Sequence, residues 1–172
     1  MDPTELTIRS FESADTGIFR NLNEDWIQEH FALEPEDELV LNHPEEHILR
    51  QGGDIFIAWR GESPVGCCAL IAKTPGVFEL GKMAVAAPFR GQGIGRALLK
   101  YAIQEARSRG VKTLVLGSNT KLQAAIHLYE TSGFRHLTGE EAPALPYERA
   151  NVFMRLDFDI VTEGLNDLRA AS

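Results

Sequence analysis

Residues 90–96 form the part of the sequence best suited to chemistry. They read Arg-Gly-Gln-Gly-Ile-Gly-Arg, so three glycines stand at alternate positions between two arginines. An alternating apolar segment over 77–85 precedes them and predicts a strand, and an apolar pattern with helical spacing follows them. A strand, a glycine turn and a helix start together offer several backbone N–H groups to an anion. Because glycine has no Cβ to block a phosphate, the stretch predicts a phosphate-binding turn.

Two common phosphate loops do not fit this turn. A Walker A loop ends in Gly-Lys-Ser/Thr, whereas this turn ends in Gly95-Arg96-Ala97. The dinucleotide fingerprint Gly-x-Gly-x-x-Gly requires a third glycine at the position where this chain has Arg96. A tight strand-to-helix turn without any ligand is the remaining alternative.

The pattern that fits is Arg-x-x-Gly-x-Gly, at Arg90, Gly93 and Gly95. With Glu-Leu-Gly-Lys-Met-Ala-Val over 79–85 before it and Ala-Leu-Leu over 97–99 after it, it resembles the acetyl-coenzyme A loop of the GNAT N-acetyltransferase family. The resemblance implies the GNAT fold, an α/β (α+β) arrangement with a mixed, mostly antiparallel sheet flanked by helices. It also implies that two central parallel strands splay apart, so that the donor's pantetheine arm pairs with the strand before the turn.

The donor-binding residues that the resemblance implies follow from this arrangement. They are Met83, Ala84, Val85, Arg90, Gly91, Gln92, Gly93, Ile94, Gly95, Arg96, Asn119 and Ala125. One position departs from the family pattern, because many relatives carry Asn seven residues before the family tyrosine, where this chain has Leu122. Asn119 stands three residues earlier, and whether it replaces that Asn is left open.

A second family block surrounds Tyr129. Residues 124–134 resemble the family's Ala-x-x-x-Tyr-x-x-x-Gly-Phe pattern, and the family tyrosine lies near the thioester sulfur. Tyr129 is therefore the candidate general acid, since a phenol with a pKa of about 10 can give a proton to a departing thiolate. The alternative is a half-buried packing tyrosine.

Glu79 is the candidate base that deprotonates the acceptor ammonium. It lies four residues before Met83, and some family members use a glutamate at this position. The alternatives are a carboxylate paired with Lys82 or an arginine, or a water relay. His127 and His136 are weaker candidates for the same role.

The resemblance places the acceptor site between the early helices and the final hairpin. It nominates Trp26, Phe31, Tyr147, Arg149 and Asn151 as lining residues. The two aromatic rings of the early helices suit an aliphatic stem, whereas Arg149 suits a carboxylate on the acceptor. These two indications conflict.

Composition and charge set further bounds. The 172 residues, 44% of them hydrophobic, suit one domain over 1–172, with a core at about 5–158 and a tail at 159–172. No apolar run approaches a membrane span, and the N-terminus lacks a signal core, so we expect a cytoplasmic protein without a membrane partner. The adjacent cysteines would point to opposite faces of a strand and imply no disulfide framework.

Charge is distributed unevenly. Residues 1–50 contain 13 acidic and 3 basic residues, while residues 82–121 contain 8 basic residues and one acid. The basic stretch coincides with the glycine turn and suits a polyanionic ligand, whereas overall acidity argues against nucleic acid. The acidic third is either a solvated face or the lining of a site for a cationic amine.

Apolar periodicity and turn residues predict the remaining elements. Strands are expected over 6–11, 54–60, 65–72, 77–85, 113–117, 134–137 and 151–158. The first helix is expected to start from a cap at Ser13 or Asp15 and to run to about residue 29, and a second is expected over 31–41, interrupted by Pro35. Asn42 is expected to cap a third, short helix. A fourth is expected over 93–109, and a fifth is expected to start from a cap at Ser118 or Asn119 and to run to residue 132. A short helix could begin at Thr162.

One metal motif occurs in the sequence. His43-Pro44-Glu45-Glu46-His47 matches a zinc-peptidase pattern, but the first histidine sits at or before the helix cap and no third ligand follows. We therefore expect no metal.

Together these features predict an acetyl-coenzyme A-dependent N-acetyltransferase that acts on a small-molecule amine or an amino-acid-like acceptor. Acetylation of a protein N-terminus or lysine is an alternative with the same chemistry. A coenzyme A-binding sensor without turnover is an alternative of another class. Homodimers are common in the family, and a homodimer is possible here.

Overall fold

A computed structural model of the protein describes residue 2 and residues 4–158. The strands are β1 (Leu6–Ser10), β2 (Asp54–Arg60), β3 (Ser63–Thr74), β4 (Val77–Val85), β5 (Thr113–Ser118), β6 (Arg135–Leu137) and β7 (Val152–Asp157). The α-helices are α1 (Thr16–His30), α2 (Pro35–Asn42), α3 (Ile94–Ser108) and α4 (Gln123–Thr131). Short helical turns lie at η1 (Ser13–Asp15), η2 (Glu45–Leu49), η3 (Ala87–Phe89) and η4 (Gly139–Glu141).

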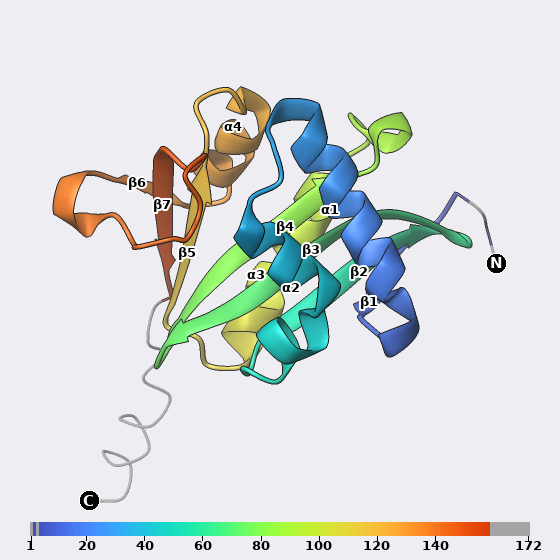
Figure 1. Cartoon of the computed structure of the whole chain (residues 1–172), viewed down its shortest axis with the longest axis horizontal. Coiled ribbons are helices and arrows are strands. Elements are labelled where there is room, and N and C mark those ends of the chain that lie inside the picture. Colours follow the sequence, from blue (N-terminus) through green and yellow to red (C-terminus); the bar gives the residue numbers. More distant parts are fainter. Residues whose placement is uncertain (1, 3, 159–172) are drawn as a thin grey trace, which may run out of the picture.

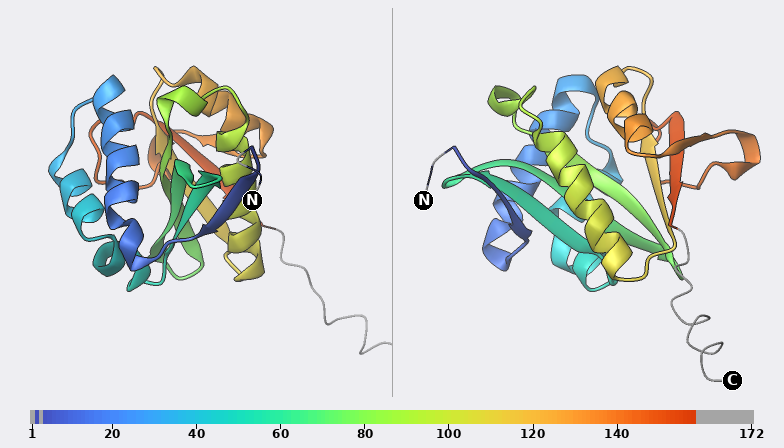
Figure 2. Two further views of the ribbon diagram at one scale, coloured as in Figure 1. Left: turned by 90° about the vertical axis from the view of Figure 1, so that its right-hand side faces the viewer. Right: turned by 180° about the vertical axis from the view of Figure 1, so that it is seen from behind.

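The strands of the described residues form one seven-stranded sheet in the order β1-β2-β3-β4-β5-β7-β6. Neighbouring strands run antiparallel except β4 and β5, which are parallel because α3 connects them. The helices cover the sheet from both sides, as Figures 1 and 2 show. This confirms the predicted fold class, including the meander of β2, β3 and β4.

The central parallel pair separates soon after it begins. Only Val77–Glu79 of β4 pair with β5, at Thr113–Val115. From Leu80 onward, the edge of β4 that faces β5 has no strand beside it, and this confirms the expected splay. A parallel pair that opens in this way leaves backbone N–H and C=O groups free for an extended ligand.

Each face of the sheet has its own hydrophobic core. The core under α1 and α2 contains Phe19 and Ile27 of α1, together with Ile55 of β2. The core under α3 contains Leu98 and Leu99, and Phe134 and Met154 pack into it. Burial on both faces is expected of a sheet with helices on each side.

The adjacent cysteines of β3 point to opposite faces, as the strand period predicts. Cys67 lies in the core under α1, and Cys68 lies in the core under α3. Both are free thiols.

Three predicted helix boundaries were wrong. Pro35 begins α2 rather than interrupting a helix, since proline at the first helical position loses no intrahelical hydrogen bond. Asn42 is the last residue of α2, and the next helical segment is the π-helical turn η2. The helix after β5 starts at Gln123, because the Asn119 side chain accepts a hydrogen bond from Lys121 N and folds the chain into a turn first.

The predicted helix from Thr162 lies outside the described residues. None of the described helices has the length and apolar character that crossing a membrane requires.

Candidate acetyl-transfer site

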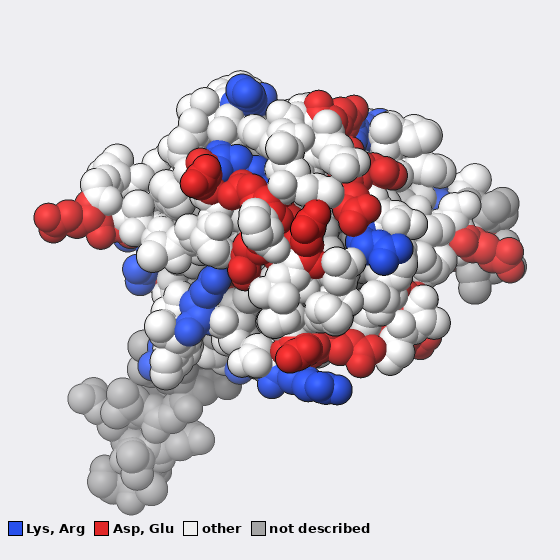
Figure 3. Space-filling model, in the orientation of Figure 1, with Lys and Arg blue, Asp and Glu red and all other residues white. Residues whose placement is uncertain are grey.

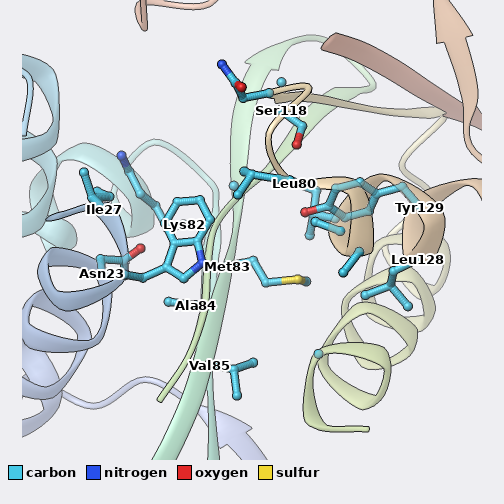
Figure 4. Close-up of a pocket in the computed structure, with 18 of the residues that line it drawn as sticks. Asn23, Ile27, Leu80, Lys82, Met83, Ala84, Val85, Ser118, Leu128 and Tyr129 are labelled. Carbon is cyan, nitrogen blue, oxygen red and sulfur yellow. The ribbon is translucent and has the colours of Figure 1, made fainter. Parts of the chain in front are cut away.

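A cavity of about 480 Å³ lies where β4 and β5 part. It is bounded by α1, the free edge of β4, the glycine turn, the end of β5, α4 and the loop before β7. Its lining residues include Asn23, Trp26, Ile27, Phe31, Glu79, Lys82, Met83, Ala84, Val85, Arg90, Gly91, Gly93, Ile94, Gly95, Arg96, Asn119, Leu122, Ala125, Leu128, Tyr129, Tyr147 and Arg149. Figure 4 shows Tyr129 on one side of β4, and Asn23 and Lys82 on the other. The cavity therefore joins most of the predicted residues into one site.

The glycine turn presents free backbone donors to this cavity. Gly91 and Gly93 have φ angles of 76° and 81°, in the left-handed region that other residues avoid. A Cβ at either position would meet nothing within 4 Å. Within residues 4–158, no backbone acceptor takes a hydrogen bond from the N–H groups of residues 91–96, which include the first N–H groups of α3.

This arrangement fits a diphosphate. Several N–H groups converge at the start of a 15-residue helix, whose dipole also favours an anion there. Open space lies directly above the glycines. The residues present therefore match the donor set that the pyrophosphate of coenzyme A needs.

The three polar side chains of the turn make different contacts. Arg90 donates to Val85 O over 3.1 Å and pairs with Glu29 over 2.6 Å, so it braces the turn against β4 and α1. Arg96 reaches Thr131 Oγ1 over 3.5 Å and lines the cavity. Gln92 is exposed and is not among the lining residues.

Tyr129 lies on α4 and points into the cavity. Its ring packs edge-on against Phe134, with 5.9 Å between ring centroids. Its hydroxyl makes no hydrogen bond with the residues that the structure describes, so the group is free to meet a ligand. Burial raises the pKa of Tyr129 to about 12, which keeps the phenol protonated at neutral pH. Such a group can act as a proton donor.

Glu79 is a buried carboxylate on β4 at the point where the two strands part. It pairs with Lys73 of β3 at a distance of 3.3 Å between Nζ and Oε1. The alternative partner Lys82 does not take that place, because its amine contacts Asp37 instead. Glu79 therefore reaches the cavity while it keeps one cationic neighbour.

Lys82 is the main site residue that the sequence interpretation missed. Its φ of 53° is the one positive φ outside glycine among the described residues, and it lies at a register shift between β3 and β4. Its side chain is only 4% exposed, and Nζ donates to Asp37 Oδ1 over 3.1 Å and to Tyr147 Oη over 2.6 Å. Strained backbone of this kind gathers at functional sites.

Arg149 belongs to the same cluster. Its two Nη atoms bond Asp37 Oδ2 and Oδ1 over 2.6 and 2.7 Å, and Nη1 also reaches Glu34 Oε2 over 3.0 Å. The predicted role of Arg149, binding an acceptor carboxylate, would need a guanidinium free of these partners. The cluster instead ties α2 to the loop before β7 beside the cavity.

The charged groups of this cluster change one another's pKa values. Burial acts to raise the pKa of Asp37, but the hydrogen bonds from Arg149 and the charge of Lys82 outweigh it, so the pKa falls below its usual range. Burial lowers the pKa of Lys82, and Asp37 offsets only part of that effect. Asp37 is thus the anion that pairs with both the buried Lys82 and the half-buried Arg149.

We expect Asp37→Asn to lower the free energy of unfolding by about 3 kcal/mol, because it leaves the Lys82 amine buried without its carboxylate and leaves Arg149 with Glu34 alone. Asp15→Asn is the matched control. Asp15 accepts the same kind of capping hydrogen bond, from Glu12 N, but its partner Arg9 is 39% exposed, so the loss should be about 1 kcal/mol. Urea unfolding of both variants measures the difference.

The pH dependence of that difference follows from the lowered pKa. A carboxyl with a depressed pKa stabilises the fold above its unfolded value of about 3.9, and the contribution is lost as pH falls through the folded pKa. The gap between wild type and Asp37→Asn should therefore narrow as the pH approaches 3. A constant gap, or equal losses in the two variants, would contradict the assigned role of Asp37.

The remaining predicted residues divide into two groups. Trp26 and Phe31 line the cavity from α1 and its C-terminal end, 6.4 Å apart between ring centroids. Asn119 also lines it, but its amide donates to Arg149 O over 2.7 Å and its oxygen accepts from Lys121 N. Asn151 is not among the lining residues, and its oxygen accepts a hydrogen bond from Thr120 N over 3.0 Å. Asn119 and Asn151 thus shape the loops beside the site.

The described part of the chain contains no group of three or more His, Cys, Asp or Glu side chains placed to hold a metal ion. His43 and His47 do lie near each other, with 6.3 Å between ring centroids.

Comparison with known proteins agrees with the geometry. The model of the acetyltransferase (GNAT) family matches residues 17–134. N-acetylaspartate synthetase of Rattus norvegicus is 31% identical over 118 residues, covering 67% of this chain and 40% of that protein. The chain spans between 40% and 66% of the length of the first curated relatives that it matches.

Two solved structures share the fold. A GNAT-family acetyltransferase from Staphylococcus aureus Mu50 superposes with a TM-score of 0.78 at 21% identity, covering 89% of this chain and 99% of that one. A Bacillus subtilis acetyltransferase in complex with CoA superposes with a TM-score of 0.67 at 21% identity, covering 90% and 99% of the two chains.

Proposed function

Because the chain belongs to the GNAT acetyltransferase family, we propose that it transfers the acetyl group of acetyl-coenzyme A to the primary amine of a small-molecule or amino-acid-like acceptor. The observation that carries this proposal is the set of unpaired N–H groups over 91–96, at the mouth of a cavity that follows the free edge of β4. A diphosphate at the turn and an extended arm along the strand are what such a surface can bind.

The donor half of the site uses the glycine turn, β4 and α4. The N–H groups of residues 91–96 would hold the diphosphate, with Arg96 beside them, and Met83, Ala84 and Val85 would flank the pantetheine arm. Ala125 lines the same space from α4. Tyr129 stays protonated and would give its proton to the departing sulfur, so that the leaving group does not depart as an anion.

The acceptor half lies on the other side of β4, where Trp26, Phe31 and Glu79 face the cavity. An ammonium cannot attack until it loses a proton, and Glu79 is placed to take it. Acidic side chains are spread over the face that α1 and α2 form, which suits a cationic acceptor (Figure 3). A relative that makes N-acetylaspartate supports an amino-acid-like acceptor.

A thiol-release assay tests the function. Purified protein and acetyl-coenzyme A are incubated with amino acids, amino acid amides, polyamines, aminoglycosides and peptides, and free coenzyme A is measured. Release with a small amine supports the proposal, and release only with peptides favours a protein acceptor. Tight donor binding by calorimetry without release from any amine would instead indicate a sensor without turnover.

We expect Glu79→Gln to slow transfer at neutral pH by about a hundredfold, since the amide cannot accept the proton, and to move the rise of rate to higher pH, where the acceptor amine loses its proton to solvent. Lys73→Met is the matched control, because it breaks the same ion pair and leaves the carboxylate in place. In this control the rise of rate should stay within the wild-type pH range. An unchanged pH profile in Glu79→Gln would remove Glu79 as the base.

A further inference from the structure

The acceptor half of the cavity contains a buried amide whose oxygen has no partner. Asn23 lies in the interior of α1, is only 2% exposed, and lines the cavity. Its Nδ2 donates to Phe19 O over 2.9 Å and to Cys67 Sγ over 3.3 Å. Its Oδ1 accepts no hydrogen bond from residues 4–158. Buried polar atoms are normally satisfied, so a free acceptor here needs an explanation.

The orientation of this amide is fixed by its neighbours. Phe19 O can only accept, so the NH₂ group of Asn23 must face it and the oxygen must face the other way. Cys67 supports the same choice. Burial raises the pKa of its thiol to about 12, and the S–H group donates to Lys82 O over 3.4 Å, which leaves the sulfur lone pairs to accept from Asn23.

The free oxygen faces space that a small molecule can enter. Among the described residues, two side-chain polar atoms are fully enclosed and lack a hydrogen-bond partner, Trp59 Nε1 and Arg60 Nε. Asn23 Oδ1 also lacks a partner but is not fully enclosed, so part of its surface is accessible. Figure 4 shows the Asn23 side chain directed from α1 toward β4. The oxygen is therefore a preformed acceptor on the wall of the cavity.

Tyr147 supplies an unused donor to the same half of the cavity. Its hydroxyl oxygen accepts from Lys82 Nζ over 2.6 Å, and its own proton has no acceptor among the described residues. Burial raises the pKa of Tyr147, so this proton stays on the phenol. Arg149 lies 4.6 Å from the ring centroid and helps hold the ring in place.

These two groups are tied to one residue. Asn23 reaches the backbone of Lys82 through Cys67, and Tyr147 meets the amine of Lys82 directly. Both side chains line the same cavity, one connected to the backbone of Lys82 and the other to its amine, so one small molecule in the cavity can meet both. One offers an acceptor and the other a donor.

Building on the proposed function, we propose that the acceptor is a primary amine with a carbonyl or carboxylate on the adjacent carbon, as in an α-amino acid or a peptide N-terminus. Asn23 Oδ1 accepts a hydrogen bond from the amine, and the Tyr147 hydroxyl donates one to the carbonyl oxygen. When the adjacent group is an uncharged carbonyl, as at a peptide N-terminus, the α-amine also has a pKa near 8 rather than near 10, so less free energy is needed to deprotonate it before attack. Asn23 and Tyr147 are substrate-positioning residues in this scheme.

The test combines protein variants with altered probes. L-Leucinamide carries both groups, 4-methylpentanamide lacks the amine, and 3-methylbutylamine lacks the carboxamide. NMR titration of the full chain should show that wild type binds L-leucinamide at least tenfold more tightly than either analogue. Asn23→Leu should weaken L-leucinamide about tenfold, equal to about 1.4 kcal/mol, and leave 4-methylpentanamide within twofold. Tyr147→Phe should weaken L-leucinamide by a similar factor and leave 3-methylbutylamine unchanged.

Cys67→Ala is the control for packing. It removes one partner of Asn23 Nδ2 and leaves Oδ1 in place, so L-leucinamide affinity should stay within twofold of wild type. Variants that weaken a probe and its truncated analogue equally would show a merely structural role and overturn the inference. Wild-type protein that fails to prefer L-leucinamide, including one that does not bind it, would overturn it too. Calorimetry with acetyl-coenzyme A separates this inference from the proposed function. If the protein binds acetyl-coenzyme A but does not distinguish L-leucinamide from its analogues, only the acceptor assignment is rejected.

Discussion

Replacing Tyr129 with phenylalanine should slow acetyl transfer about a thousandfold while acetyl-coenzyme A binds as before. The hydroxyl makes no hydrogen bond with the described residues, so its loss leaves no buried partner unsatisfied and costs the fold little. The ring keeps its edge-on contact with Phe134 in the variant. What disappears is a proton donor that burial holds in its neutral form, and general acids of this kind contribute about 10²–10⁴-fold to rate.

Tyr101→Phe is the matched control for this prediction. Tyr101 is also a helix phenol with a raised pKa, and its ring packs edge-on against Phe56 at 5.0 Å, but it lies on α3 and does not line the cavity. Turnover should change less than twofold in this control. The comparison uses thiol release for rate and calorimetry for donor affinity. Wild-type turnover in Tyr129→Phe would remove the phenol from the mechanism, and weakened donor binding with normal turnover would make it a binding group.

Much of the fold could be predicted from local sequence because its signals are local. The strands over 54–60 and 77–85 were predicted with their observed ends, since alternation and flanking turn residues mark both boundaries. Errors occurred where a side chain competes with the backbone. Asn119 bonds Lys121 N and delays α4, and Asp37 caps α2 by accepting from Glu34 N after a proline that reads as a break.

The candidate site divides in the same way. The glycine turn and Tyr129 stand in contiguous motifs, so their residues could be named from sequence. The charged cluster could not, because Lys82, Asp37 and Arg149 come from three distant segments and meet only through tertiary structure. Glycine in a strand would have indicated a positive φ, but the residue with a φ of 53° at the strand irregularity is a lysine, so the sequence gives no sign of it.

The position of Asn23 is unusual already in the sequence. It stands four residues after Phe19 and four before Ile27, on the stripe that α1 buries. An amide on an apolar stripe is unfavourable inside a helix unless its groups find partners. That pattern indicates a buried polar role, although only the structure shows which atom remains free.

Gly93→Val should reduce affinity for acetyl-coenzyme A at least a hundredfold, equal to about 2.7 kcal/mol. Gly93 adopts a φ of 81°, and an L-residue held in the left-handed region costs about 1–2 kcal/mol, more when it is β-branched. If the loop relaxes to a negative φ, the N–H groups of residues 91–96 no longer converge on one point. If it does not relax, the new side chain fills the open space above the turn, where the diphosphate would lie.

Gly110→Val separates this effect from backbone strain alone. Gly110 has a φ of 76°, and a Cβ there would also meet nothing within 4 Å, but it follows the other end of α3 and does not line the cavity. Both variants should lose similar stability on thermal unfolding, because the same backbone conformation is strained in each. Only Gly93→Val should lose donor binding by calorimetry. Retained donor binding in Gly93→Val would mean that the phosphates bind elsewhere. Equal loss of donor affinity in both variants would mean that backbone strain itself weakens the site, through the helix α3 that both glycines flank.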